Sequence, residues 1–158
     1  MGAMFLTSMR SGFLFLSCWL LCSTVDMFAA TADVTQDQAM QVEEETREVI
    51  TSWASAWQSQ LDDVYLLHYH PEFSPEAGNR ESWEALRRRR ILEPEEIPIG
   101  LRDFELSNYD AAQVQVRFWL VYTRPGYADR THKEITLGKN GRIWQILRER
   151  NLEVIRLP

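Results

Sequence analysis

Four consecutive arginines, Arg87 to Arg90, form the densest cluster of chemically active side chains in the sequence. On a helix, four consecutive side chains spread around the axis and cannot form one basic face. Glutamates on both sides of the run favour local ion pairs on a solvated surface. Arg87 and Arg90 lie three positions apart on the side of Trp83, so either guanidinium could reach inward. There it would hold a carboxylate through two parallel hydrogen bonds.

The carboxylate that such an arginine binds belongs either to a ligand or to the protein itself. Glu149, near the end of a predicted strand, is the internal candidate. We expect Arg90 to pair with Glu149 and tie helix to sheet, and Arg87 to contact an anionic ligand. Removing one member of a buried ion pair costs about 3 to 5 kcal/mol, whereas losing a ligand contact leaves the fold intact. Unfolding experiments therefore separate the two roles.

The histidines, His68, His70 and His132, are the candidates for metal ligands. A His-x-His pair on a helix projects poorly toward one point, and no carboxylates with matching spacing can be identified. The sequence also contains no glycine-rich phosphate loop and no nucleophile motif. We therefore expect neither a metal site nor a cofactor.

The net charge of −6 over 158 residues argues against a general nucleic-acid-binding protein, because phosphate binding usually needs a basic face. The length suits a single domain with a sizeable core. Six Trp, five Tyr and seven Phe suit either a packed core or a lined cavity.

The N-terminal segment differs in composition from the rest of the chain. Arg10 is the one charged residue before Asp26, an apolar run covers residues 13–21, and Ala30-Thr31-Ala32 supplies small side chains. This order is typical of a secretory signal peptide. The apolar run is shorter than the ~18 to 20 residues of a spanning helix. We expect a periplasmic or secreted domain with no stable membrane span after cleavage. The alternative is a retained anchor or a lipoprotein.

Both cysteines, Cys18 and Cys22, lie inside this segment. Cleavage would leave a domain without cysteine, which excludes disulfides and thiol catalysis. The predicted organisation is a signal peptide over 1–32, a flexible lead over 33–44 and one domain over 45–158.

The apolar spacing predicts three helices, over residues 45–61, 62–70 and 79–93. In the first, Trp53 and Trp57 lie four apart and share a face. Asn79 is the expected cap of the third helix, with Ser82 as the alternative.

After residue 94 the apolar period changes from helical to alternating. Residues 97–101 alternate with one parity and residues 104–106 with the other, which predicts a β-bulge near Arg102-Asp103. Asn140-Gly141 is typical of a hairpin turn. The remaining strands are expected over 114–122, 130–137 and 142–149. The tail, Leu152 to Leu157, is expected either to add a short strand or to cover an edge of the sheet.

These elements predict an α+β fold, a cone-shaped half-barrel in which three N-terminal helices pack on a curved antiparallel sheet of about four to five strands. Such a sheet closes only partly, so we expect a pocket between its concave face and the helices. Some of the expected lining residues will belong to the plain core. The expected lining residues are Trp53, Trp57, Tyr65, Tyr69, Trp83, Arg87, Arg90, Phe118 and Tyr122.

The order of three helices and a curved sheet resembles the nuclear transport factor 2-like (NTF2-like) superfamily, also called SnoaL-like. An ordered set of motifs is similar, more closely, to the C-terminal domains attached to some periplasmic L,D-transpeptidase-family proteins. The resemblance spans about residues 45–150. The motifs are Trp53-x3-Trp57, Tyr65-x3-Tyr69-x3-Phe73, Gly78-x-Arg80-x2-Trp83-x3-Arg87-x2-Arg90-Ile91 and Gly141-x2-Trp144-x-Ile146-x2-Glu149.

The resemblance implies an exported, non-catalytic pocket domain for ligand binding, protein interaction or regulation in the bacterial cell envelope. The transpeptidase chemistry lies outside this domain and does not transfer. The expected partner is a small anionic ligand or an envelope protein.

Enzymes of the superfamily place an Asp and often a His inside the cone, as base and proton relay. The alternative function is therefore a small-molecule isomerase or dehydratase. Its candidate residues are Asp62 or Asp63 near Tyr65 and His68, with His132 or Tyr122 across the pocket. An Asp at this position is also typical of a helix cap. We expect the cap and no catalytic residue.

Trp119 and Val121 alternate outward from the predicted sheet. They would leave an apolar patch on a monomer, which predicts a homodimer through the outer face of the sheet.

Overall fold

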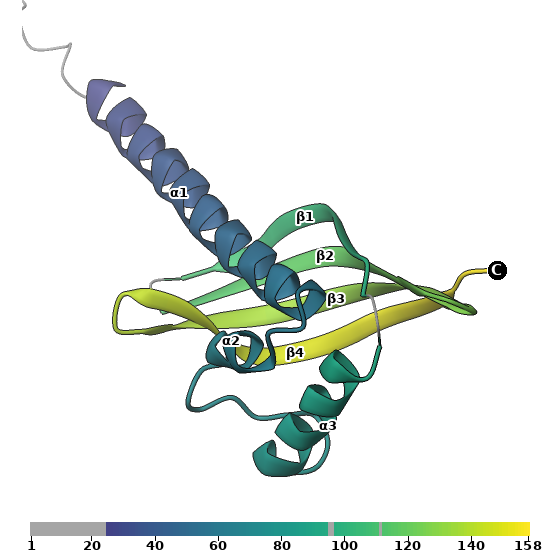
Figure 1. Ribbon diagram of the computed structural model, residues 1–158. Coiled ribbons are helices and arrows are strands. Elements are labelled where there is room, and N and C mark those ends of the chain that lie inside the picture. The colour runs from purple at the N-terminus through teal and green to yellow at the C-terminus, as the bar shows by residue number, and fades with distance from the viewer. Residues whose placement is uncertain (1–24, 95–96, 111) are drawn as a thin grey trace, which may run out of the picture. The chain divides into compact units, whose positions relative to one another are not determined.

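The computed structural model describes residues 25–94, 97–110 and 112–158. It divides into two units, 1–36 and 37–158, and the second unit holds the sheet. Most of the predicted signal peptide lies outside the described residues. The elements are α1 (Val25–Gln58), α2 (Asp62–Leu67), α3 (Arg80–Leu92), β1 (Ile99–Tyr109), β2 (Gln113–Arg124), β3 (Tyr127–Asn140) and β4 (Ile143–Arg156) (Figure 1).

The second unit has the predicted α+β architecture, with helices packed against one four-stranded sheet. The sheet is antiparallel throughout and follows the order β1-β2-β3-β4. The register of β1 against β2 shifts between Arg102 and Glu105, and Asp103 adopts a positive φ of 52°. This irregularity confirms the predicted β-bulge. A bulge bends its strand and restores the inward parity of the apolar side chains.

The core lies between α1, α2 and the inner face of the sheet. Trp53 is fully buried at its centre, with ring centroids 5.6 Å from Tyr65 and 6.4 Å from Phe118. The alternation predicted for β2 places Val116 and Phe118 inward, and both are fully buried. The apolar face of α1, with its helical period, therefore packs on the inward side chains of β2, which recur at every second residue.

Side-chain contacts fix the position of α3. Asn79 caps it by accepting a hydrogen bond from Ser82 N, as predicted. The Gln60 side-chain amide, just after α1, donates to Ile91 O at 3.0 Å. Arg88 pairs with Asp62 and Asp63, which lie in the first turn of α2. These contacts tie α3 to α2 and to the segment that follows α1.

Several boundaries differ from the prediction. Residues 33–44, expected as a flexible lead, lie within α1, and their flexibility stays a prediction. The tail does not form a separate strand, because β4 continues to Arg156 past a register shift opposite His132/Lys133. Leu61, rather than Asp62, occupies the N-cap of α2, and no side-chain cap bond forms there. None of the described helices is both long and apolar enough to cross a membrane.

Candidate functional site

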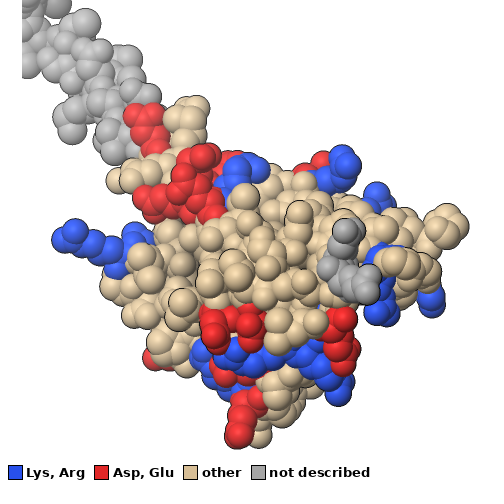
Figure 2. Space-filling view, viewed as in Figure 1, with Lys and Arg blue, Asp and Glu red and all other residues tan. Residues whose placement is uncertain are grey.

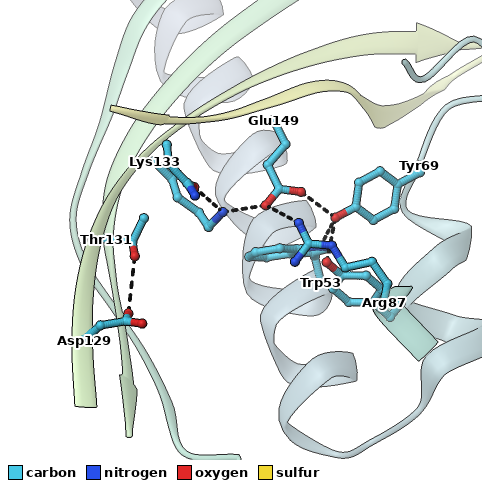
Figure 3. A network of polar contacts seen from close by, with 9 residues as sticks. Trp53, Tyr69, Arg87, Asp129, Thr131, Lys133 and Glu149 are labelled. Carbon is cyan, nitrogen blue, oxygen red and sulfur yellow. Dashed lines mark hydrogen bonds and ion pairs between the residues drawn. The ribbon is translucent and has the colours of Figure 1, made fainter. Parts of the chain in front are cut away.

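A buried carboxylate, Glu149 on β4, organises the polar interior of the cone (Figure 3). Its Oε1 lies 3.2 Å from Arg87 Nη2 and 2.5 Å from Lys133 Nζ. Its Oε2 accepts a hydrogen bond of 2.9 Å from the Tyr69 hydroxyl. Lys133 also donates to Asn151 Oδ1 at 2.9 Å. One carboxylate therefore joins α3, β3, β4 and the segment after α2.

Three aromatic side chains extend this network into the core. The Trp53 indole Nε1 donates to the Tyr69 hydroxyl at 3.0 Å. The hydroxyls of Tyr65 and Tyr69 lie 2.7 Å apart. Burial raises the pKa of both tyrosines above their ordinary value. Both hydroxyls therefore stay neutral and keep the proton that the network needs.

The charge state of Glu149 follows from its two cations. Burial alone would raise the pKa of this carboxyl, but Lys133 and Arg87 outweigh burial and hold its pKa at about 2. For Arg87, burial acts to lower the pKa, and Glu149 together with Tyr65 and Tyr69 raises the pKa above its ordinary value. The Glu149 carboxylate and the Arg87 guanidinium therefore stay ionised together as a buried ion pair.

A cavity of about 430 Å³ lies beside this network. Trp57 and Tyr122 stack in its wall, with ring centroids 6.1 Å apart and an interplanar angle of 20°. Four basic and two acidic side chains line it, although the whole chain carries a net charge of −6. The lining residues are Trp57, Arg87, Arg90, Glu93, Pro94, Leu120, Tyr122, Arg124, Tyr127, Asp129, Thr131, Lys133 and Asn151.

The indole of Trp57 carries an unused hydrogen-bond donor. Among the described residues, its Nε1 is the buried side-chain nitrogen or oxygen that lacks a partner. An unmade hydrogen bond of this kind costs about 1 to 3 kcal/mol. Trp57 itself lines the cavity, although its Nε1 atom is buried.

The nine residues predicted to line a pocket fall into two groups. Trp57, Arg87, Arg90 and Tyr122 line the cavity. The others, Trp53, Tyr65, Tyr69, Trp83 and Phe118, do not line it. Four of these are buried core residues, and the Trp83 ring packs 4.6 Å from the rings of Tyr69 and Phe73. A binding role for the first group stays a prediction.

The prediction missed the contribution of β3 to the cavity. Asp129, Thr131 and Lys133 all line it. Their spacing of two residues continues to Ile135 and Leu137, which are fully buried on the same face. A lysine at an inward position of a strand was therefore a readable signal for a buried ion pair.

The assignment of the two inward arginines was wrong. Arg87, not Arg90, forms the ion pair with Glu149. Arg87 is directed there by Trp83, whose ring centroid lies 5.3 Å from the guanidinium carbon. Arg90 lines the cavity and has no ion-pair partner among the described residues. The spacing of three residues places Arg87 and Arg90 on the same side of the helix, but it does not show which of them pairs with Glu149.

The candidate Asp/His group is not brought together. Asp62 and Asp63 pair with Arg88. His68 lies 3.0 Å from the Ser52 hydroxyl through its Nε2, and His132 stacks on Trp119 at 4.7 Å. None of these residues lines the cavity described above, and its acidic members are Glu93 and Asp129. The described residues contain no cluster of three or more side chains suited to a metal ion.

Residues 45–150 match the sequence model of the Cds6 C-terminal NTF2-like domain. The chain belongs to this family. The match agrees with the fold, in which helices cover one face of an open antiparallel sheet. A search of curated proteins found no significant match.

Solved structures resemble this NTF2-like domain in fold. Bd1075 of Bdellovibrio bacteriovorus is 23% identical with a TM-score of 0.62, over 68% of this chain and 39% of that protein. The helical cell shape determining protein Pgp2 of Campylobacter jejuni (K307A mutant) is 18% identical with a TM-score of 0.57, over 65% and 38%. This chain therefore spans about two fifths of each.

For a third similar structure, the match spans nearly the whole of that protein. It is a protein of Novosphingobium aromaticivorans, provisionally assigned as a scytalone dehydratase. It is 9% identical with a TM-score of 0.63, over 78% of this chain and 92% of that one. At these identities the likeness concerns the fold alone.

Proposed function

We propose that this NTF2-like domain is an exported, non-catalytic binding module of the bacterial cell envelope. Its cavity holds a small anionic ligand, with Arg90 as the polar anchor. The observation that carries this proposal is the charge of the cavity: with Glu149 beside it counted, four basic side chains face three acidic ones, which leaves a positive excess in a chain of net charge −6. A basic hollow in an acidic protein favours an anion.

The basic side chains of the cavity divide into two roles. Glu149 binds Arg87 and Lys133, so these two cations are structural. Arg90 and Arg124 have no acidic partner among the described residues. A free guanidinium binds a carboxylate through two parallel hydrogen bonds. The free cations therefore serve a ligand, while the paired ones hold the wall in place.

The remaining wall suits the rest of such a ligand. The stacked rings of Trp57 and Tyr122 offer a flat apolar surface, and the buried Trp57 Nε1 offers a donor. A ligand with a carboxylate, an apolar portion and a carbonyl acceptor would use all three features. Peptidoglycan peptides have this chemistry, with free carboxylates and amide carbonyls, and we propose them as the ligand class.

The proposed place in the cell envelope has two supports. The sequence before residue 33 has the order of a signal peptide. One similar structure is a helical cell shape determining protein, of which this chain matches 38%. The link to domains attached to L,D-transpeptidase-family proteins is part of the same proposal.

Binding can be measured on the indole signals of the full ¹⁵N-labelled chain by NMR. The probe is a soluble peptidoglycan tetrapeptide with free carboxylates, and the matched control is the same peptide with its carboxylates amidated. The Trp57 signal is assigned by its loss in Trp57→Phe. We expect the tetrapeptide to shift this signal and the amidated peptide to bind at least about tenfold more weakly, because a charge-assisted hydrogen bond is lost.

Arg90→Gln should weaken tetrapeptide binding by a similar factor without changing the melting temperature. Arg89→Gln, one position along the same helix, is the matched control, because Arg89 is exposed and does not line the cavity. Two results together would contradict an anionic ligand at Arg90. The parent chain would bind the tetrapeptide and the amidated peptide equally well, and Arg90→Gln would bind the tetrapeptide as tightly as the parent chain does.

Export has a separate test. N-terminal sequencing of the protein from fractionated native cells should find a chain that starts near Asp33 in the envelope or periplasmic fraction. A chain that keeps Met1 and stays in the cytosolic fraction would contradict export.

A further inference from the structure

A second, shallower groove lies outside the cone, between α1, α2 and the β3–β4 hairpin. It encloses about 460 Å³ and shares no lining residue with the cavity described above. The groove is lined by Glu45, Glu48, Val49, Ser52, Val64, Leu67, His68, Arg142, Ile143, Trp144 and Gln145.

Large apolar side chains of this groove are exposed. Leu67 is 71% exposed, Ile143 59% and Val64 42%. They come from two elements that are far apart in sequence, α2 and the start of β4, so the fold has gathered them. A contiguous apolar surface in contact with water favours association with another surface.

On the outer face of the sheet, where the sequence predicts a dimer, Trp119 packs against side chains of its own chain. The Trp119 ring stacks on His132 at 4.7 Å, and the Arg130 guanidinium lies 4.4 Å from its centroid. These contacts leave Trp119 half-buried within its own chain. The groove, rather than this face, presents the bare apolar side chains.

The charges beside the apolar strip have opposite signs. Glu48 on α1 and Arg142 at the hairpin both line the groove, and neither has an ion-pair partner among the described residues. Glu45 differs, because it accepts a hydrogen bond of 2.9 Å from Trp144 Nε1. Figure 2 shows acidic side chains gathered on α1. An acid and a base thus flank the same apolar strip.

We propose that this groove binds the same groove of a second copy of the chain. In a two-fold contact, residue i meets residue j and j meets i. Leu67 and Ile143 of the two copies would pack together at the centre, and Glu48 of each copy would meet Arg142 of the other. A patch that carries both signs is complementary to itself, whereas a partner with a single sign of charge would meet a like charge on one side.

The oligomeric state of the full chain can be followed by sedimentation velocity from micromolar to several hundred micromolar concentration. We expect a monomer–dimer equilibrium at low salt that weakens as salt rises. Glu48→Arg and Arg142→Glu should each raise the dimer Kd at least about tenfold, because the two-fold axis places each new like-charge pair twice. The double variant Glu48→Arg/Arg142→Glu should return the Kd to near that of the parent.

Two further variants distinguish a dimer formed through the apolar side chains of the groove from one formed through the outer face of the sheet. Leu67→Ser removes an exposed side chain and should raise the dimer Kd without lowering the melting temperature. Trp119→Ala, on the outer face of the sheet, should leave the Kd unchanged. A chain that stays monomeric over the whole range, a dimer lost only in Trp119→Ala, or no recovery in the double charge reversal would each overturn the proposal.

Discussion

Arg87 Nη2 lies 3.2 Å from Glu149 Oε1, and this contact joins α3 to β4 across 62 residues of sequence. Glu149 shares the same oxygen with Lys133, so one carboxylate balances two cations. Its other oxygen accepts from Tyr69. A buried network therefore holds the wall of the cavity in place.

Glu149→Gln should destabilise the fold strongly. The substitution leaves Arg87 and Lys133 close together without their counter-charge, and breaking a buried pair in this way costs about 3 to 5 kcal/mol. Urea unfolding followed by tryptophan fluorescence measures the change in the free energy of unfolding. Glu153→Gln, an exposed glutamate of the same strand, is the control and should change this free energy by less than about 0.5 kcal/mol.

Stability should fall in acid, and Glu149 sets the pH window. Its pKa is about 2 in the folded protein against an ordinary value of 4.5. Because the folded pKa is the lower one, the carboxylate stabilises the fold above pH 4.5, and this contribution is lost as the pH falls toward about 2. Urea unfolding at several pH values should show the decline. Glu149→Gln should be less stable than the parent at neutral pH, and its free energy of unfolding should fall less steeply as the pH is lowered. If this pH dependence were the same in the variant and the parent, Glu149 would not be the group responsible.

Tyr69→Phe should test the aromatic part of the network. The hydroxyl donates to Glu149 and accepts from Trp53 Nε1, so its removal leaves a buried indole N–H without a partner. We expect a loss of about 1 to 3 kcal/mol. Thermal unfolding measures it against Tyr109→Phe, whose side chain is 40% exposed and should have little effect.

Arg87 and Arg90 should respond differently to the same substitution. Arg87→Met leaves Glu149 short of one cation and should lower the free energy of unfolding by about 3 kcal/mol or more. Arg90→Met removes an exposed side chain and should leave it within about 0.5 kcal/mol of the parent. Chemical unfolding of the two variants side by side is the measurement. The opposite ranking would mean that Arg90 ties helix to sheet after all.

Local features of the fold could be predicted because they depend on neighbours in sequence. Asn79 caps α3 through its own side chain. The β3–β4 hairpin turn was predicted to within one residue: it consists of Gly141, at φ 66°, and Arg142, while Asn140 still pairs with Ile143 in the sheet. The switch of parity around Arg102-Asp103 predicted a bulge, which the register confirms. Each of these features is set by backbone preference or by the two-residue period of a strand.

The choice among side chains that share a face was decided only by the tertiary structure. Arg87 and Arg90 have the same spacing relation to the core, but the rotation of α3 and the register of β4 bring Glu149 to Arg87. The inward position of Lys133 was readable in the sequence, yet its partner lies 16 residues away on another strand. A sequence shows which side chains face inward. Which of them meet depends on how helices and strands are placed against one another, to within the reach of one hydrogen bond.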